Sequence, residues 1–117
     1  MLLAGSAAIL MMTSGAPVQA GYEPLVDGRT AEAMEQLQTS AEVNPDDPVV
    51  QINLGVAYAR QGRDAEARAM FEAAMRNSER MSLETANGEW KDSRHLAKLA
   101  LTMLARGDFR PDRMAAR

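Results

Sequence analysis

One stretch of this sequence places small and large residues at spacings that fit two helices packed against each other. The residues that form this pattern are Leu54, Gly55, Tyr58, Gly62, Ala67, Phe71 and Ala74. Gly55 and Ala67 are small, so they allow two helix backbones to approach closely. Tyr58 and Phe71 are large enough to fill the space beside that contact. The pattern therefore predicts an antiparallel helix pair between positions 47 and 81.

The ends of the two helices carry their own signals. Pro48 suits the first helical position, where its missing N–H group costs nothing. Gly62 allows the chain to leave the first helix in a left-handed conformation. Asp64 is expected to cap the second helix, and Glu66 lies favourably in its first turn.

Part of the pattern recurs one period of about 34 residues earlier. Gly28, Ala33 and Leu37 correspond to Gly62, Ala67 and Phe71. Thr30–Val43 is therefore expected to form the second helix of a preceding unit. Its first helix is missing from the prediction, because residues 21–27 are too short to supply one, and residues 21–29 are taken as a linker.

The set L-G-x-x-Y…A-x-x-x-F resembles the tetratricopeptide repeat, with Gln51 in place of the usual Trp. The resemblance covers one full repeat at positions 47–81 and half a repeat before it. It implies an all-α fold, a short array of antiparallel helix pairs. It also implies a scaffold without catalytic activity, whose first helices line a groove for a peptide or a partner domain.

The period breaks after Met81, and a β-hairpin insertion is expected over Ser82–Asp92. Asn87-Gly88 favours a two-residue turn, because both residue types tolerate positive φ. In the register set by that turn, Thr85 would lie opposite Trp90 on the neighbouring strand. A lone hairpin is marginal in water, so Trp90 is expected to pack on the helices, with contact to a partner as the alternative.

A final amphipathic helix is expected over Arg94–Arg106, capped by Ser93 and ended by Gly107. It is similar to the first helix of a further repeat. Its second helix does not follow, because Phe109-Arg110-Pro111 interrupts the chain. The helical domain is therefore predicted over positions 30–106, followed by a basic tail over positions 107–117.

The N-terminal 20 residues carry no charged side chain. Val18 and Ala20 are small residues at the positions that signal peptidase reads, so a signal peptide over residues 1–20 is expected. The start lacks the basic residues of a typical signal, and an uncleaved membrane anchor is the alternative. Either interpretation places the protein outside the cytoplasm, in the periplasm or envelope of a bacterium.

Composition excludes several classes of function. The net charge of −3 and the pI of about 5.1 give no basic surplus for nucleic acid. The chain has no cysteine, and His95 is its one histidine, so a zinc site lacks ligands. Paired acids at catalytic spacing and phosphate-binding loops are also missing from the sequence. We therefore expect no enzyme activity, no metal and no cofactor.

The resemblance suggests where a ligand would bind. In chaperone-binding members of the family, an Asn on one first helix and two basic residues on the next grip a peptide's C-terminal carboxylate. Asn53 occupies the Asn position here, and Arg94 and Lys98 occupy the two basic positions. The candidate groove consists of Val49, Ile52, Asn53, Val56, Arg94 and Lys98.

Two functions remain open from the sequence. The first is an exported scaffold that binds a protein or peptide, with membrane contact only through the N-terminal segment. The alternative is a structural subunit that stacks its short array on a partner or on a second copy of itself, because repeat arrays with few units bury little core.

Overall fold

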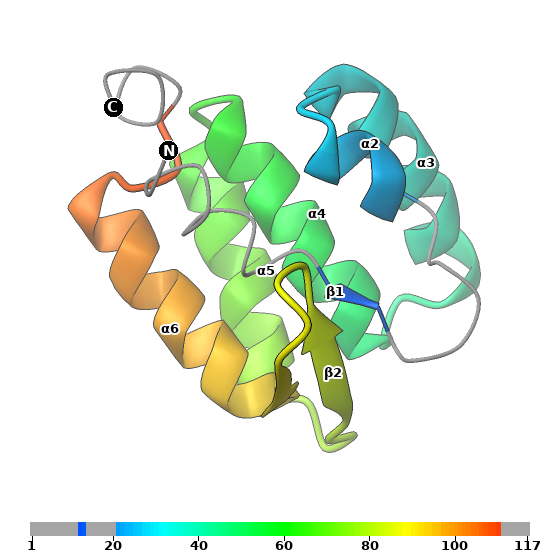
Figure 1. Cartoon of the computed structure of the whole chain (residues 1–117), viewed down its shortest axis with the longest axis vertical. Coiled ribbons are helices and arrows are strands. Elements are labelled where there is room, and N and C mark those ends of the chain that lie inside the picture. The colour runs from blue at the N-terminus through cyan, green and yellow to red at the C-terminus, as the bar shows by residue number, and fades with distance from the viewer. Residues whose placement is uncertain (1–11, 14–20, 111–117) are drawn as a thin grey trace.

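The computed structural model describes residues 12–13 and 21–110, and it is a short helical array with a small sheet on one side (Figure 1). The elements are β1 (Met12–Thr13), α2 (Tyr22–Val26), α3 (Thr30–Val43), α4 (Pro48–Arg60), α5 (Asp64–Arg76), β2 (Ser82–Thr85), β3 (Trp90–Asp92) and α6 (Ser93–Arg106). Helix α3 packs on α4, α4 on α5, and α5 on α6. The expected helical array is confirmed, since consecutive helices are neighbours in space.

Helices α4 and α5 form the predicted pair. Phe71 and Ala67 of α5 are fully buried, and Leu54 of α4 is 5% exposed. A Cβ atom added to Gly55 would lie 2.4 Å from Cε1 of Phe71, so only glycine permits this approach. Tyr58 is half-buried, and the Arg63 guanidinium stacks 4.6 Å from its ring centroid. The small-against-large packing read from the sequence is therefore the packing observed.

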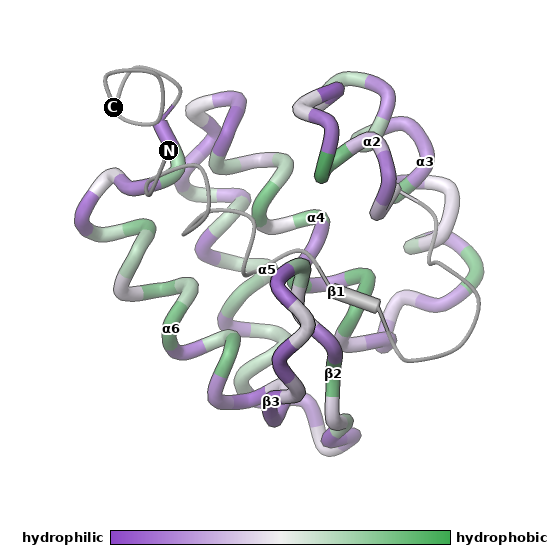
Figure 2. The backbone as a smooth tube through the Cα atoms, viewed as in Figure 1, coloured by the Kyte–Doolittle hydropathy of each residue, from purple (hydrophilic) through white to green (hydrophobic). Residues whose placement is uncertain are grey.

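Helix α4 lies at the centre of the array. Its residues from Pro48 to Ala57 are all buried, and Ala59 is buried as well. Figure 2 shows that α4 is mostly hydrophobic along its length, whereas α3 and α6 alternate hydrophobic and hydrophilic positions. A helix that is apolar on most sides must be covered on most sides. The neighbours α2, α3, α5, α6 and β1 supply that cover.

The helix starts differ from the prediction in one respect. Asp47 caps α4 as its side chain accepts a hydrogen bond from the N–H of Val49 at 2.9 Å. Helix α5, however, begins at Asp64 itself, and no side chain caps it. Helix α6 begins at Ser93, and the cap is Asp92, whose carboxylate accepts from the N–H of His95. Each of these two helices thus begins one residue earlier than predicted, and Asp64 and Ser93 are first helical residues instead of caps.

The segment assigned to a linker contains the short helix α2. It packs on α3, and its Leu25 is fully buried. Gly21 precedes it with φ of 85°, and the Gly21 N–H donates to Oε1 of Gln36 at 2.9 Å. Five residues cannot replace a full helix, but they cover part of α3 where the first helix of that half repeat is missing.

The hairpin is present, but its register is one residue away from the prediction. Strand β2 pairs with β3 through Ser82↔Asp92, Leu83↔Lys91 and Glu84↔Trp90. The loop has three residues, because the N–H of Thr85 donates to the carbonyl of Glu89 at 2.8 Å. Gly88 has φ of 87°, but Asn87 does not have the positive φ that the two-residue turn needs at both positions.

This slip moves Trp90 to the outer face of the hairpin. A shift of one residue exchanges the two faces of a strand. Thr85, the expected partner of Trp90, is 2% exposed, whereas Trp90 itself is 54% exposed. The expectation that Trp90 packs on the helices is therefore wrong, and Leu83 is the hairpin residue that enters the core.

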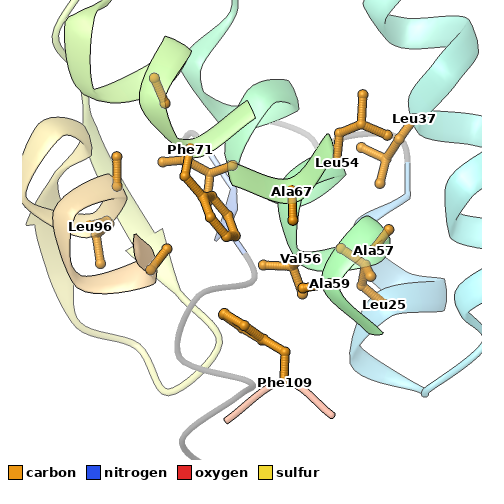
Figure 3. Close-up of a cluster of buried hydrophobic side chains, with 14 of the residues drawn as sticks. Leu25, Leu37, Leu54, Val56, Ala57, Ala59, Ala67, Phe71, Leu96 and Phe109 are labelled. Atoms are coloured by element: carbon orange, nitrogen blue, oxygen red, sulfur yellow. The ribbon is translucent and has the colours of Figure 1, made fainter. Parts of the chain in front are cut away.

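The chain after α6 turns back into the core. Gly107 ends the helix with φ of 74°. Phe109 is 1% exposed, and its ring centroid lies 5.9 Å from that of Phe71 (Figure 3). The first residues of the expected tail are thus part of the core. Arg110 follows, its guanidinium 3.6 Å from the Asp64 carboxylate, and the rest of the tail lies outside the described residues.

Candidate interaction surfaces

The α4 part of the candidate groove is one continuous helix face. Val49, Ile52, Asn53 and Val56 follow one another at helical spacing, so they point in one direction. All four are fully buried. Helix α2 and strand β1 both contact α4 (Figure 1). The face to which the resemblance assigns ligands is therefore buried within this chain.

The two basic positions lie on α6 and are used differently. The Arg94 guanidinium donates from Nε at 3.1 Å and from Nη2 at 2.8 Å to the Asn77 carbonyl. A cation at this place stabilises the carbonyl-rich end of α5. Lys98 is exposed. Because Asn53 is buried and Arg94 is engaged at the end of α5, the three side chains do not form an open carboxylate clamp.

Arg60 extends the buried α4 face by one turn, and sequence reasoning missed it. Its Nη1 donates to the Leu25 carbonyl at 2.7 Å, which links α4 to α2. Burial lowers the pKa of the Arg60 guanidinium to about 10, so the group is still protonated at neutral pH. An arginine in the last turn of an apolar helix was the available signal, but its distant partner was not visible in the sequence.

A polar cleft of about 710 Å³ lies at the other end of α4, lined by Asp46, Gln51, Ala73, Asn77, Ser78 and Glu79. The Asn77 amide nitrogen donates to the Asp46 carbonyl at 2.7 Å and to Oε1 of Gln51 at 3.0 Å. Gln51 in turn donates to the Pro45 carbonyl at 3.1 Å. The residue that replaces the family's Trp thus ties the α3–α4 loop to the end of α5, a structural role.

The outer edge of β2 is a second candidate surface. Hydrogen bonds of Met81 and Thr85 run towards the β3 side, so the backbone groups of Ser82 and Glu84 point to the opposite edge. Strand β1 lies on that edge, with Thr13 opposite Glu84 and Met12 opposite Thr85. The sheet order is β1-β2-β3. The sequence reasoning predicted the hairpin but not this third strand.

The described residues contain no group of His, Asp and Glu side chains arranged to hold a metal ion. His95 is exposed at the start of α6. In the same part of the chain, no helix is both long and apolar enough to cross a bilayer.

The stacked helix pairs and their small-against-large contacts define a helical-repeat protein. Residues 25–78, which contain α3, α4 and α5, match the family model of the tetratricopeptide repeat. The chain therefore contains a tetratricopeptide-repeat region, and proteins of this family are in general non-catalytic scaffolds for protein–protein interaction.

One curated relative is cellulose synthase operon protein C of Komagataeibacter xylinus, which is 40% identical over 62 residues. The match covers 53% of this chain but only 5% of that protein, so the chain spans a small part of its relative's length. No solved structure matches the chain.

Proposed function

We propose that this protein is a non-catalytic adaptor that binds a segment of a partner protein outside the bacterial cytoplasm. The observation that carries the proposal is the close-packed α4–α5 pair, with Gly55 against Phe71, within the stretch that matches the repeat family. Such a pair is a rigid platform with no chemistry of its own. Its use is to present surfaces to other proteins.

Export is supported by the sequence of residues 1–20, which lie outside the described residues except for Met12 and Thr13. The stretch has no charge, and small residues precede the expected cut after Ala20. The relative belongs to a bacterium and is named for a cellulose synthase operon. We therefore place the adaptor in the periplasm or envelope, with retention of residues 1–20 as a membrane anchor as the alternative.

A structural subunit of a larger assembly is the second candidate. Val26 is 44% exposed and Val43 is 73% exposed, and they lie at the two ends of the α2–α3 unit. On that side the array has only the five-residue α2 where a complete repeat has a full helix. A further helix pair, from a partner or from a second copy, would cover these two valines.

Expression of the full chain with a C-terminal tag in a bacterial host tests the compartment. We expect the tagged protein in the osmotic-shock fraction, with a mass that begins at Gly21. The variant Ala20→Phe, whose side chain is too large for signal peptidase, is expected to keep residues 1–20. Recovery of uncut protein in the cytoplasm would contradict export.

Cross-linked capture from the same fraction tests the adaptor function. Wild type and Arg76→Ala, a change on the exposed side of α5, are expected to retain the same partner. Gly55→Val is expected to lose it, because the added side chain cannot fit against Phe71. Light scattering of the purified chain separates the alternatives, since a stable monomer would argue against the structural subunit.

A further inference from the structure

We propose that the outer edge of β2 is a docking site for an extended, uncharged segment of a partner protein, which adds to the sheet as a strand. The strand would take the place that β1 occupies in the structure. The inference deepens the adaptor function and rests on it, because it names the form in which the partner is bound.

The geometry of the edge supports strand addition. Thr85 donates to Glu89, and Ser93 donates to the Met81 carbonyl, so these positions of β2 face β3. In an antiparallel ladder the facing direction alternates, so the N–H and carbonyl of Glu84 face the other edge. Thr13 lies directly opposite Glu84. An extended segment thus already sits where a partner strand would sit.

The free edge of β2 is longer than strand β1, which pairs with it. Strand β2 runs from Ser82 to Thr85, but β1 pairs only with Glu84 and Thr85. Ser82 also presents its backbone groups to this edge, by the same alternation. A partner strand paired along all of β2 would therefore make more backbone contacts than β1 makes, which favours exchange of the short strand for a longer one.

The charge of Glu84 disfavours an acidic docking strand, and the stretch that supplies β1 indicates an uncharged one. Glu84 is half-buried, and its charge adds to burial in raising the pKa of the Tyr22 phenol. A negative residue placed directly opposite Glu84 would be repelled. Strand β1 itself comes from a stretch of 20 residues without charge, and it contacts the apolar helix α4.

The position of β1 in the chain supplies the means of opening the site. Met12 and Thr13 lie within residues 1–20, the stretch proposed to be removed during export. Their removal would free the edge of β2 in the compartment where the adaptor acts. While they are attached, they compete at an effective concentration of about millimolar, as expected for a tethered ligand.

Peptide binding to the full-length chain tests the proposal. In one variant, Met12→Pro and Thr13→Pro together unseat β1, because proline cannot join a sheet ladder. The probe is a fluorescent synthetic peptide with the sequence of positions 8–16. Measured by anisotropy, it is expected to bind the double variant at least about tenfold more tightly than the wild type, which carries its own competitor.

Two modified peptides provide a matched control. The N–H of Thr13 points towards Glu84, whereas that of Met12 points away, by the alternation of the ladder. N-methylation at the position of Thr13 is therefore expected to abolish binding, and N-methylation at the position of Met12 is expected to preserve it. Equal binding of the two peptides would overturn the proposal.

Hydrogen exchange in the wild-type chain gives a readout that does not depend on the double variant folding. The Glu84 amide is expected to exchange slowly and that of Trp90, on the open side of β3, quickly. Fast exchange of the Glu84 amide would overturn the proposal. Dimers of the wild type linked by exchange of their N-terminal segments would also overturn it, because the docked strand would then come from a second copy of the chain. If the peptides fail but capture still depends on Gly55, the adaptor function stands and strand docking falls.

Discussion

The α4–α5 pair and the β2–β3 hairpin solve the problem of burial in opposite ways. In the helix pair, Phe71 is fully buried and Gly55 leaves no room for even a methyl group. In the hairpin, Leu83 is fully buried, while Trp90 two positions past the loop is 54% exposed. The helix pair is tightly packed by its side chains, whereas the hairpin has one buried face and one exposed face.

The difference separates stability from recognition. Side chains that fill a fixed volume contribute strongly to stability and leave little surface for a partner. A short hairpin contributes less, but its strand edges and outer face stay within reach of another chain. Substitutions of buried residues in the helix pair should therefore destabilise the protein, whereas substitutions on the outer face of the hairpin should leave its stability nearly unchanged.

The largest effect is expected for Phe71→Ala in α5. Truncation of a fully buried Phe costs about 3–5 kcal/mol, against a total stability of about 5–15 kcal/mol for a small domain. Urea denaturation followed by far-ultraviolet circular dichroism measures the change. Arg76→Ala, at the exposed end of the same helix, is the control and should leave the midpoint nearly unchanged. A loss below about 1 kcal/mol would show that the pair is not the core of the fold.

The next effect is expected for Gly55→Ala. Alanine is the better helix former by about 1 kcal/mol, but overpacking costs about 1–3 kcal/mol. Overpacking should win, because the new Cβ would lie 2.4 Å from the Phe71 ring, which cannot swing away as a flexible chain end can. The double variant Gly55→Ala with Phe71→Leu should recover part of the loss in the same denaturation assay. A simple sum of the two single effects would mean that the residues are not in contact.

These two sites also show why the helix pair was predictable from sequence. A glycine and a large aromatic residue at fixed spacing are local signals, and the packing of neighbouring helices follows from them. The starts of these helices were predicted to within one residue. At α6 two good capping residues, Asp92 and Ser93, lie side by side, whereas Arg63 precedes α5 and no side chain caps that helix.

The features that sequence reasoning missed depend on contacts between distant segments. Nothing around Met12 indicates that it will pair with Thr85, because strand pairing is set by the partner as much as by the strand. The hairpin register failed for a different reason, since Asn-Gly is compatible with both two-residue and three-residue loops. The choice of a two-residue loop placed Trp90 on the wrong face of the hairpin. The burial of the candidate groove on α4 could not be foreseen, because β1 and α2 were not predicted.

A smaller effect is expected at Asp92, where the hairpin joins α6. Its carboxylate caps the helix and lies 3.3 Å from Arg80, which lowers its pKa below the usual value. A carboxylate with a lowered pKa stabilises the fold fully above its unfolded-state pKa of about 3.9 and loses that contribution as the pH falls through the folded-state value. The group is partly exposed, so solvent screens much of the charge effect.

Asp92→Asn tests this contribution, because it keeps the capping oxygen and removes the charge. Replacement of a cap altogether costs about 1 kcal/mol, so the Asn variant should lose less than that at pH 7. Thermal denaturation between pH 7 and pH 2.5 should show the two proteins converging as the wild-type carboxylate is protonated. A difference that stays constant down to pH 2.5 would assign the effect to hydrogen-bond geometry and not to charge.

The smallest effect on folding is expected for Trp90→Ala, on the outer face of the hairpin. Exposed side chains without close partners usually change stability by less than about 0.5 kcal/mol, so the urea midpoint should hardly move. Leu83→Ala, on the inner face of the same hairpin, is the matched contrast and should cost about 2–5 kcal/mol. Far-ultraviolet circular dichroism is the suitable probe, because the chain has one Trp and its fluorescence disappears in the variant. If Trp90→Ala destabilised the fold as much as Leu83→Ala does, the hairpin would be closed on both faces, and its contrast with the helix pair would fail.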